Sequence, residues 1–190
     1  DSAVSYGENS LELLYQNQFI KSYVGENQSK HHRWALDTNQ INTYGLGNIL
    51  STEKIKWWEN CSIGDRKLIS YQDRYVHICP LICEDLARQD PIAPVVRALG
   101  PDLVVALLLD GPQMQGRWSH RYSSALVDEP GCSVLSISPY GMTQRSTNDG
   151  DHPPSSIVAL WCDTRSPCEL KLESGKIGIL LKLKLEEEVQ

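Results

Sequence analysis

The chain has 190 residues, of which 41% are hydrophobic and 22% charged, with a formal net charge of -6 and a sequence pI near 5.3. This length and composition fit one globular domain with its own core. The acidic balance gives no electrostatic footprint for nucleic acid or an anionic membrane, and the longest apolar runs are far shorter than a membrane span. Because the chain begins with Asp1 and its first ten residues do not resemble a signal peptide, we interpret it as part of a longer or processed polypeptide.

Six cysteines are spread along the chain: Cys61, Cys79, Cys83, Cys132, Cys162 and Cys168. An even number permits disulfides, but the chain is long and not rich in cysteine, and three of the six lie in or beside apolar strand-like runs. We therefore expect free thiols and a cytoplasmic location. The spacings lack the short paired knuckles of structural zinc sites, so neither a metal nor another cofactor is expected.

The first part of the chain contains one predicted strand and a long irregular region. Residues 17–24 (NQFIKSYV) are rich in aromatic and β-branched residues, which predicts a strand. The polar stretch GENQSKHHRWAL follows. Its adjacent His31 and His32 could suggest a metal site, but neighbours on a strand point to opposite faces, so a polar surface role or a supporting role is favoured. Residues 37–67 show no clear period and predict loops with short helical pieces.

The middle of the chain has the clearest pattern. Residues 74–82 predict a strand. A helix follows, with Asp90 as N-cap, Pro91 as its first residue and Gly100 just after its last turn. Residues 102–109 are a continuous apolar run, typical of a strand that is covered on both faces. Together these elements predict a βαβ unit with two parallel strands.

The last part of the chain predicts another helix and three strands. Ser119 is a suitable N-cap for the helix HRYSSALVDE, which a Pro-Gly pair ends. Residues 132–138 predict the next strand, and residues 156–161 and 176–185 predict two more. The connection between the last two has no room for a full helix, so we expect them to form an antiparallel pair.

Cys83 lies at the end of the first strand of the predicted βαβ unit, in CPLICEDLARQDP. Ligands and reactive groups in open α/β sheets gather at the carboxyl ends of the strands. Backbone N–H groups at such a position favour the thiolate, which would lower the pKa of the thiol, and they can also hold an oxyanion. The position favours a nucleophile, while a packed thiol stays the open alternative.

The segment VHICPLICEDLARQDPIAPVVRALGPDLVVALLLDG resembles the nucleophile segment of the nitrilase, or carbon–nitrogen hydrolase, superfamily. In that family a strand ends in an apolar residue and Cys, followed by an acidic or aromatic residue and Asp, then a helix, Gly-x-Asp and an apolar strand. Residues 82–85 (ICED) and 100–102 (GPD) match this order. RWSHRYSSALVDEPGCSVLSISPYGM is similar to the family's arginine-bearing helix and next strand, YQNQFIKSYVGENQSKHHRWAL to its lysine segment, and LWCDTRSPCELKLESGKIGILLKLKL to its final strands.

The resemblance implies an α/β fold, the nitrilase-like αββα sandwich of mixed sheets with helices on the outer faces. It covers residues 1–190 as one domain that lacks its first strands and helices and belongs to a longer polypeptide. It also implies a Glu-Lys-Cys catalytic set that hydrolyses a small amide, nitrile or carbamoyl compound. In this set Cys83 is the nucleophile, Lys30 stabilises the tetrahedral intermediate, and the backbone N–H of Glu84 is a second donor.

The chain departs from the family pattern in two places. The family's glutamate base lies well upstream of the lysine, and only 29 residues precede Lys30, so we expect the base to lie outside this chain. A supporting glutamate usually follows the lysine, and in that region Asp37 is the candidate. Arg121, on the arginine-bearing helix, is a candidate for binding a carboxylate substrate or for pairing with Asp85 or Asp128.

Two hypotheses of function follow. The first is a thiol-dependent hydrolase of a small amide or nitrile. The second is a nitrilase-like module of a larger protein, kept for assembly or small-molecule sensing; such appended domains include those of reverse transcriptases linked to phage defence, although no polymerase motif occurs here. The resemblance also suggests a homo-oligomer or docking on other domains of a longer chain.

Overall fold

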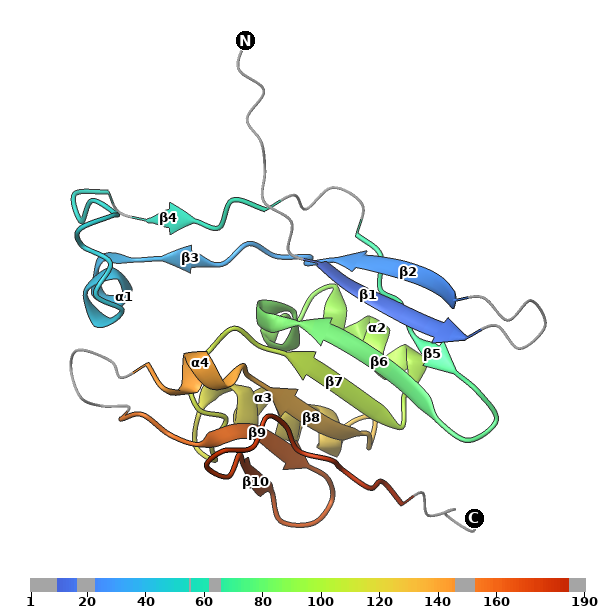
Figure 1. The fold of residues 1–190 in the computed structure, drawn as a ribbon. Helices are drawn as coiled ribbons and strands as arrows, with labels where there is room; N and C mark the ends of the chain where they lie inside the picture. The colour runs from blue at the N-terminus through green and yellow to red at the C-terminus, as the bar shows by residue number, and fades with distance from the viewer. Residues whose placement is uncertain (1–9, 17–22, 55, 62–65, 146–152, 185–190) are drawn as a thin grey trace.

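The computed structural model of the chain describes residues 10–16, 23–54, 56–61, 66–145 and 153–184 (Figure 1). The strands are β1 (Ser10–Gln16), β2 (Tyr23–Ser29), β3 (Ala35–Leu36), β4 (Trp57–Trp58), β5 (Tyr71–Gln72), β6 (His77–Ile82), β7 (Leu103–Leu107), β8 (Ser133–Ile137), β9 (Ile157–Cys162) and β10 (Cys168–Lys171). The helices are α1 (Thr38–Thr43), the 3₁₀ helix η1 (Cys83–Ala87), α2 (Ile92–Leu99), α3 (Trp118–Asp128) and α4 (Tyr140–Thr143).

The centre of the fold is a six-stranded sheet with the order β10-β9-β8-β7-β6-β5. Strands β6, β7 and β8 run parallel, and the outer strands pair antiparallel. The prediction of a βαβ unit is confirmed, because α2 connects β6 to its parallel neighbour β7. The carboxyl ends of the three parallel strands therefore meet at one edge of the sheet, which is the left-hand edge in Figure 1.

Helices α2 and α3 pack on one face of this sheet (Figure 1). Their apolar side chains, among them Ile92, Val96 and Leu126, join the buried strand residues Val104 and Leu160 in the main core. A smaller cluster around Leu103, Leu135 and Ala159 lies on the opposite face. Because strand side chains alternate between faces, the central strands contribute apolar residues to both clusters, which explains their continuous apolar runs.

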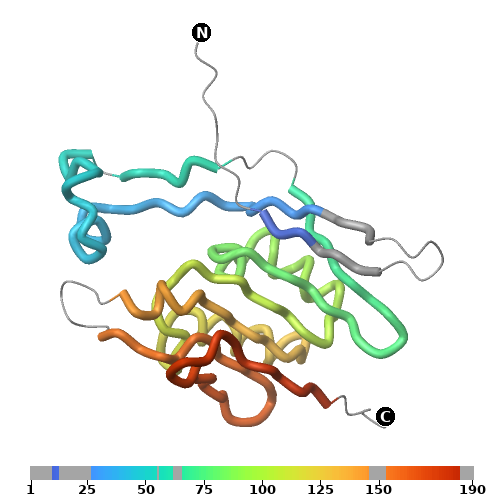
Figure 2. The backbone as a smooth tube through the Cα atoms, viewed as in Figure 1, coloured from blue at the N-terminus to red at the C-terminus, as the bar shows by residue number. Residues whose placement is uncertain are grey.

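Two small antiparallel pairs stand apart from the main sheet. Strands β1 and β2 form a hairpin, and β3 pairs with β4 through Ala35 opposite Trp58 and Leu36 opposite Trp57. The tube in Figure 2 shows these segments lying above the sheet's β6 side. The strand predicted at residues 17–24 lies outside the described residues up to residue 22, and its last two residues begin β2.

The predicted helix starts are each displaced. Helix α2 has Pro91 rather than Asp90 at its N-cap, although Gly100 ends it in the left-handed conformation (φ 55°) as the pattern predicts. Helix α3 begins at Trp118 with Arg117 at its N-cap. Ser119 lies inside the helix and is fully buried. Its hydroxyl donates a hydrogen bond to the buried side chain of Gln113 (2.8 Å) and does not cap the helix backbone.

The predicted pairing of residues 156–161 with residues 176–185 is wrong. Strand β9 does pair antiparallel at the edge of the sheet, but with β10, which is much nearer in sequence. Residues 176–184 form no strand and expose apolar side chains, with Ile177 and Leu180 almost completely accessible. Residue 185 lies outside the described residues.

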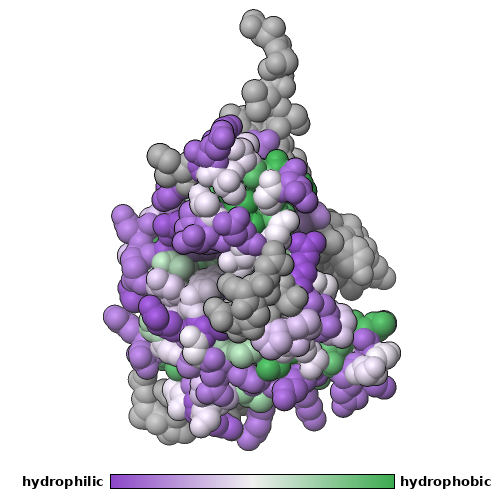
Figure 3. All heavy atoms as spheres, turned by 90° about the vertical axis from the view of Figure 1, so that its left-hand side faces the viewer, coloured by the Kyte–Doolittle hydropathy of each residue, from purple (hydrophilic) through white to green (hydrophobic). Residues whose placement is uncertain are grey.

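The α/β class is confirmed, because the described residues form a mixed six-stranded sheet with a few helices. The two longest helices, α2 and α3, cover one face of the six-stranded sheet, so the four-layer sandwich stays a proposal. Figure 3 looks onto the side where the carboxyl ends of the parallel strands lie, and its surface is mainly hydrophilic with patches of less polar residues. Among the described residues, no helix has the length and hydropathy needed to cross a bilayer.

Candidate functional site

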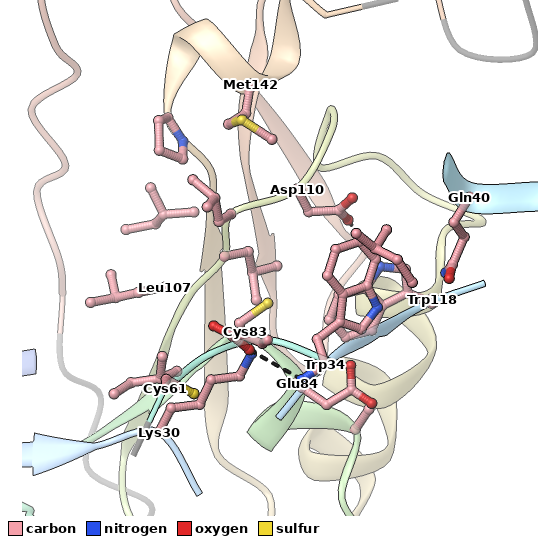
Figure 4. A pocket seen from close by; sticks show the side chains of 18 of the residues that line it. Lys30, Trp34, Gln40, Cys61, Cys83, Glu84, Leu107, Asp110, Trp118 and Met142 are labelled. Atoms are coloured by element: carbon pink, nitrogen blue, oxygen red, sulfur yellow. Dashed lines mark hydrogen bonds and ion pairs between the residues drawn. The ribbon is translucent and has the colours of Figure 1, made fainter. Parts of the chain in front are cut away.

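Cys83 begins η1 directly after β6, at the edge where the parallel strands end. Its backbone has φ of 49°, and among the described residues it is the one non-glycine residue with positive φ. A side chain in this left-handed region costs conformational energy, and such residues concentrate at functional sites. Cys83 packs against the edge of the main core, and its half-buried side chain also lines a cavity (Figure 4).

The cavity has a volume of about 1060 Å³ and lies between the strand ends and the segment that contains β3, α1 and β4. This volume is slightly larger than the usual range for small-molecule sites, about 300 to 1000 Å³. The walls combine apolar and aromatic side chains with a few charged ones. The apolar and aromatic ones include Trp34, Tyr44, Leu107, Trp118, Tyr122 and Met142, and the charged ones are Lys30, Glu59, Glu84, Asp110, Arg117 and Arg145.

Lys30 follows β2 directly, and its side chain is only 2% exposed. Figure 4 shows it reaching toward Cys83 in the cavity. Its Nζ lies 2.5 Å from Oε2 of Glu59, and the same oxygen accepts a hydrogen bond from the backbone N–H of Trp34 (3.1 Å). Because a buried ammonium needs a negative partner, the carboxylate of Glu59 compensates the charge of Lys30 and fixes the direction of its side chain.

The Cys83 thiol experiences opposing influences on its pKa. Burial has the largest effect and raises the pKa above its ordinary value, and the negative charge of Asp110 also raises it. The charge of Lys30 lowers the pKa, as do hydrogen bonds from the backbone N–H groups of Leu109 and Glu84. The net direction is upward, so the expected lowered pKa is wrong: the cation and the backbone donors are present, but burial outweighs them.

The other cysteines differ from Cys83 in their surroundings. All six are free thiols in the structure. Burial raises the pKa of Cys79 to about 12 and that of Cys132 and Cys162 to about 11, and these three belong to the apolar core. Cys61 is buried beside the cavity, and burial raises its pKa as well. Of the six, Cys83 is the one that combines access to the cavity with a nearby lysine and two backbone donors.

Asp110 forms a second charged group across the cavity. It follows β7, and both of its carboxylate oxygens accept hydrogen bonds from Nη2 of Arg117 at 2.9 Å. The indole N–H of Trp118 donates to the same carboxylate (2.9 Å), and the backbone N–H of Asp110 donates to the hydroxyl of Ser138 (3.2 Å). These contacts hold Asp110 and Arg117 rigidly as a pair, with little exposure of either side chain.

The structure separates the predicted site residues into two groups. Cys83, Lys30 and Glu84 all line the cavity, and the side chain of Glu84 pairs with Arg88 (2.7 Å). Asp37 does not contact Lys30; its carboxylate caps α1 by accepting a hydrogen bond from the backbone N–H of Gln40 (2.8 Å).

Arg121 also lies away from the cavity. It is exposed on α3, and no contact with Asp85 or Asp128 accompanies it. Arg117, one helical turn earlier, does line the cavity. Arg117 is the N-cap of α3 and pairs with Asp110, whereas Arg121 lies within the helix and is exposed.

Sequence reasoning missed Glu59, Asp110 and Arg117. Asp110 could have been found, since it follows a predicted parallel strand at the edge where functional groups gather. No sequence pattern pointed to Glu59 as a site residue. It lies in the aperiodic region, and it reaches Lys30 only because its backbone N–H bonds to the carbonyl of Trp34 (2.8 Å), next to the β3–β4 pair.

In comparisons with known proteins, no family model matches the chain, and no curated protein matches it. Within the described part of the chain, no group of three or more His, Cys, Asp or Glu side chains is arranged to hold a metal ion.

Proposed function

We propose that the chain carries a cysteine-dependent carbon–nitrogen hydrolase site of the nitrilase type, in an αββα-type domain. The observation that carries the proposal is Cys83 in a left-handed turn at the carboxyl end of β6, with its thiol in the same cavity as the buried ammonium of Lys30. A core thiol needs neither a strained backbone nor a buried cation beside it. The combination is suited to nucleophilic attack with stabilisation of the charge that forms.

In the proposed reaction the sulfur of Cys83 forms a bond to the carbon of an amide, nitrile or carbamoyl group. The electron pair of the C–O or C–N multiple bond moves to the heteroatom, where Lys30 and the backbone N–H of Glu84 stabilise the negative charge. For an amide, the C–N bond then breaks and the amine leaves with a proton. Water hydrolyses the resulting thioester, releasing the acid and restoring the thiol.

The thiol proton needs an acceptor, since the raised pKa keeps Cys83 protonated at neutral pH. Each described carboxylate of the cavity is already bound by a cation. The pairs are Glu59 with Lys30, Glu84 with Arg88 and Asp110 with Arg117. We therefore assign the general base to a carboxylate outside the described residues, and general acid–base help of this kind is worth about 100- to 10,000-fold in rate.

The proposal is tested with a panel of small amides, nitriles and ureido compounds, following release of ammonia or amine. The full-length protein, with the proposed base present, should turn over at least one member, and Cys83→Ala should abolish the reaction. Cys61→Ala is the matched control, since Cys61 also lines the cavity but has no strained backbone, and it should keep most of the rate. Equal loss in both variants, or full activity of Cys83→Ala, would refute the assignment.

A second candidate is a module that binds a small molecule without hydrolysing it. Its support is the raised pKa of Cys83 together with the absence of an uncommitted carboxylate among the described cavity residues. In that case panel members should raise the melting temperature of wild type and of Cys83→Ala equally, with no product formed. A stabilisation that needs the thiol, or any product, favours the hydrolase.

A further inference from the structure

Gln28 connects the lysine segment to the nucleophile strand. It lies on β2 two residues before Lys30, and both side chains are buried. Its Nε2 donates a hydrogen bond to the carbonyl of Pro80 (3.1 Å), and its Oε1 accepts one from the backbone N–H of Ile69 (2.8 Å). Pro80 lies on β6, three residues before Cys83, so this contact joins the two segments on one side of the site.

Asp85 connects the same two segments on the other side of the site. It is fully buried in η1, two residues after Cys83. Its Oδ2 accepts a hydrogen bond from the backbone N–H of His31 (3.0 Å), and its Oδ1 lies 3.1 Å from Nδ1 of His32. These are the two residues that follow Lys30. Both carboxylate oxygens are thus engaged, and Asp85 is not among the residues that line the cavity.

Backbone pairing does not hold these segments together. The hairpin β1–β2 and the six-stranded sheet are separate sheets, and among the described residues no backbone–backbone hydrogen bond joins residues 23–34 to residues 77–88. The position of Lys30 relative to Cys83 therefore depends on side-chain contacts. The contacts of Gln28 join the segments just before Lys30 and Cys83 in sequence, and the contacts of Asp85 join them just after these residues.

We propose that Gln28 and Asp85 form a two-point clamp that sets the position of the Lys30 ammonium relative to the Cys83 sulfur. They are positioning residues, since neither lines the cavity. The inference deepens the proposed function. It rests on that function for the role of the clamp in catalysis, but not for the existence of the clamp. The clamp itself has a readout that needs no substrate, because a displaced ammonium changes the ionisation of the thiol.

The experiment measures the rate of iodoacetamide labelling of Cys83 against pH, by peptide mapping of the full chain. Besides Lys30, the groups that act on this thiol are Asp110 and the backbone donors of Leu109 and Glu84, and none of them is substituted in the variants. Lys30→Met should move the titration midpoint to higher pH by about one to three units, the usual effect of an opposite charge at close range. Gln28→Ala and Asp85→Ala should each move it in the same direction, by at least about half a unit.

Double variants separate positioning from general damage. In the Lys30→Met background, Gln28→Ala and Asp85→Ala should cause no further change, because no ammonium is left to displace. Val134→Ala, a cavity-forming change in the core away from the clamp, should destabilise the fold without moving the midpoint. If Asp85→Ala does not fold, Asp85→Asn replaces it: the amide keeps the size and one acceptor, so a midpoint between wild type and Lys30→Met is expected.

A folded Gln28→Ala or Asp85→Asn protein that titrates like wild type would overturn the clamp, and so would an equal shift with and without Lys30. These outcomes are distinct from failure of the proposed function. If no substrate is turned over, the titrations still decide the clamp. If hydrolysis occurs but the titrations do not move, the clamp alone is wrong.

Discussion

The Lys30–Glu59 pair gives the sharpest prediction about stability. Lys30 is 2% exposed and Glu59 25% exposed, and their charged atoms lie 2.5 Å apart. The substitution Glu59→Gln removes the negative charge but keeps the size and one acceptor oxygen. The ammonium is then buried without a counter-charge, which is among the most costly changes that a single substitution makes.

The expected loss follows from these exposures. Removing one partner of a fully buried ion pair costs about 3 to 5 kcal/mol in the free energy of unfolding. Since water reaches a quarter of Glu59 and the amide can still accept a hydrogen bond, we expect about 2 to 3 kcal/mol. Glu84→Gln is the matched control. It breaks the more exposed pair with Arg88 within one helical segment and should cost about 0.3 to 0.5 kcal/mol.

The assay is urea unfolding at pH 7 with linear extrapolation. The double variant Lys30→Met with Glu59→Gln should be more stable than Glu59→Gln alone, because it removes the uncompensated charge together with its partner. The reasoning is refuted if Glu59→Gln costs no more than Glu84→Gln, or if adding Lys30→Met to Glu59→Gln brings no recovery.

Further expectations concern rate, pH and packing. Lys30→Arg keeps the charge but replaces a compact ammonium with a wide planar fork, so turnover should fall about 100- to 1000-fold with the fold intact; activity within threefold of wild type would exclude the role of Lys30. Above pH 9 the core thiols lose their protons in the unfolded state but keep them in the folded state, so stability should fall with rising pH by about 1.4 kcal/mol per unit for each thiol until its folded pKa is reached. Cys79→Ala, which removes a thiol with a pKa of about 12, should reduce that slope, and an unchanged slope would contradict the effect of burial on this thiol. Leu160→Ala should cost about 2 to 5 kcal/mol in urea unfolding, because the side chain is fully buried in the core, and a cost below 1 kcal/mol would contradict the packing.

The parallel centre of the sheet could be predicted because local patterns and long-range pairing agree there. The apolar runs that become β6, β7 and β8 are separated by helical segments, and right-handed crossover connections leave one arrangement for them. That arrangement places Cys83 at the carboxyl edge. The family resemblance added Lys30, which the structure brings into the same cavity.

The other features of the site and of the sheet edge depend on long-range contacts, which local sequence patterns do not predict. Asp37 was the expected carboxylate beside Lys30, but its position before a short helix favours capping, and Glu59 reaches Lys30 through the β3–β4 pairing of two short strands. The pKa of Cys83 depends on how deeply the thiol is buried, which only the packed structure defines. Residues 176–185 alternate like a strand, but alternation does not specify a partner, and β10 takes the place beside β9.

The most direct measurement of the central claim is the site of covalent capture by a nitrile. A thiol adds to a nitrile carbon to form a thioimidate, so the protein gains the full mass of the nitrile without a leaving group. After incubation with a panel of small nitriles and acid quenching, peptide mapping should find the adduct on Cys83, with much less in Lys30→Met and none on the exposed Cys168. Adducts that favour Cys168, or that form on Cys83 equally with and without Lys30, would contradict the account.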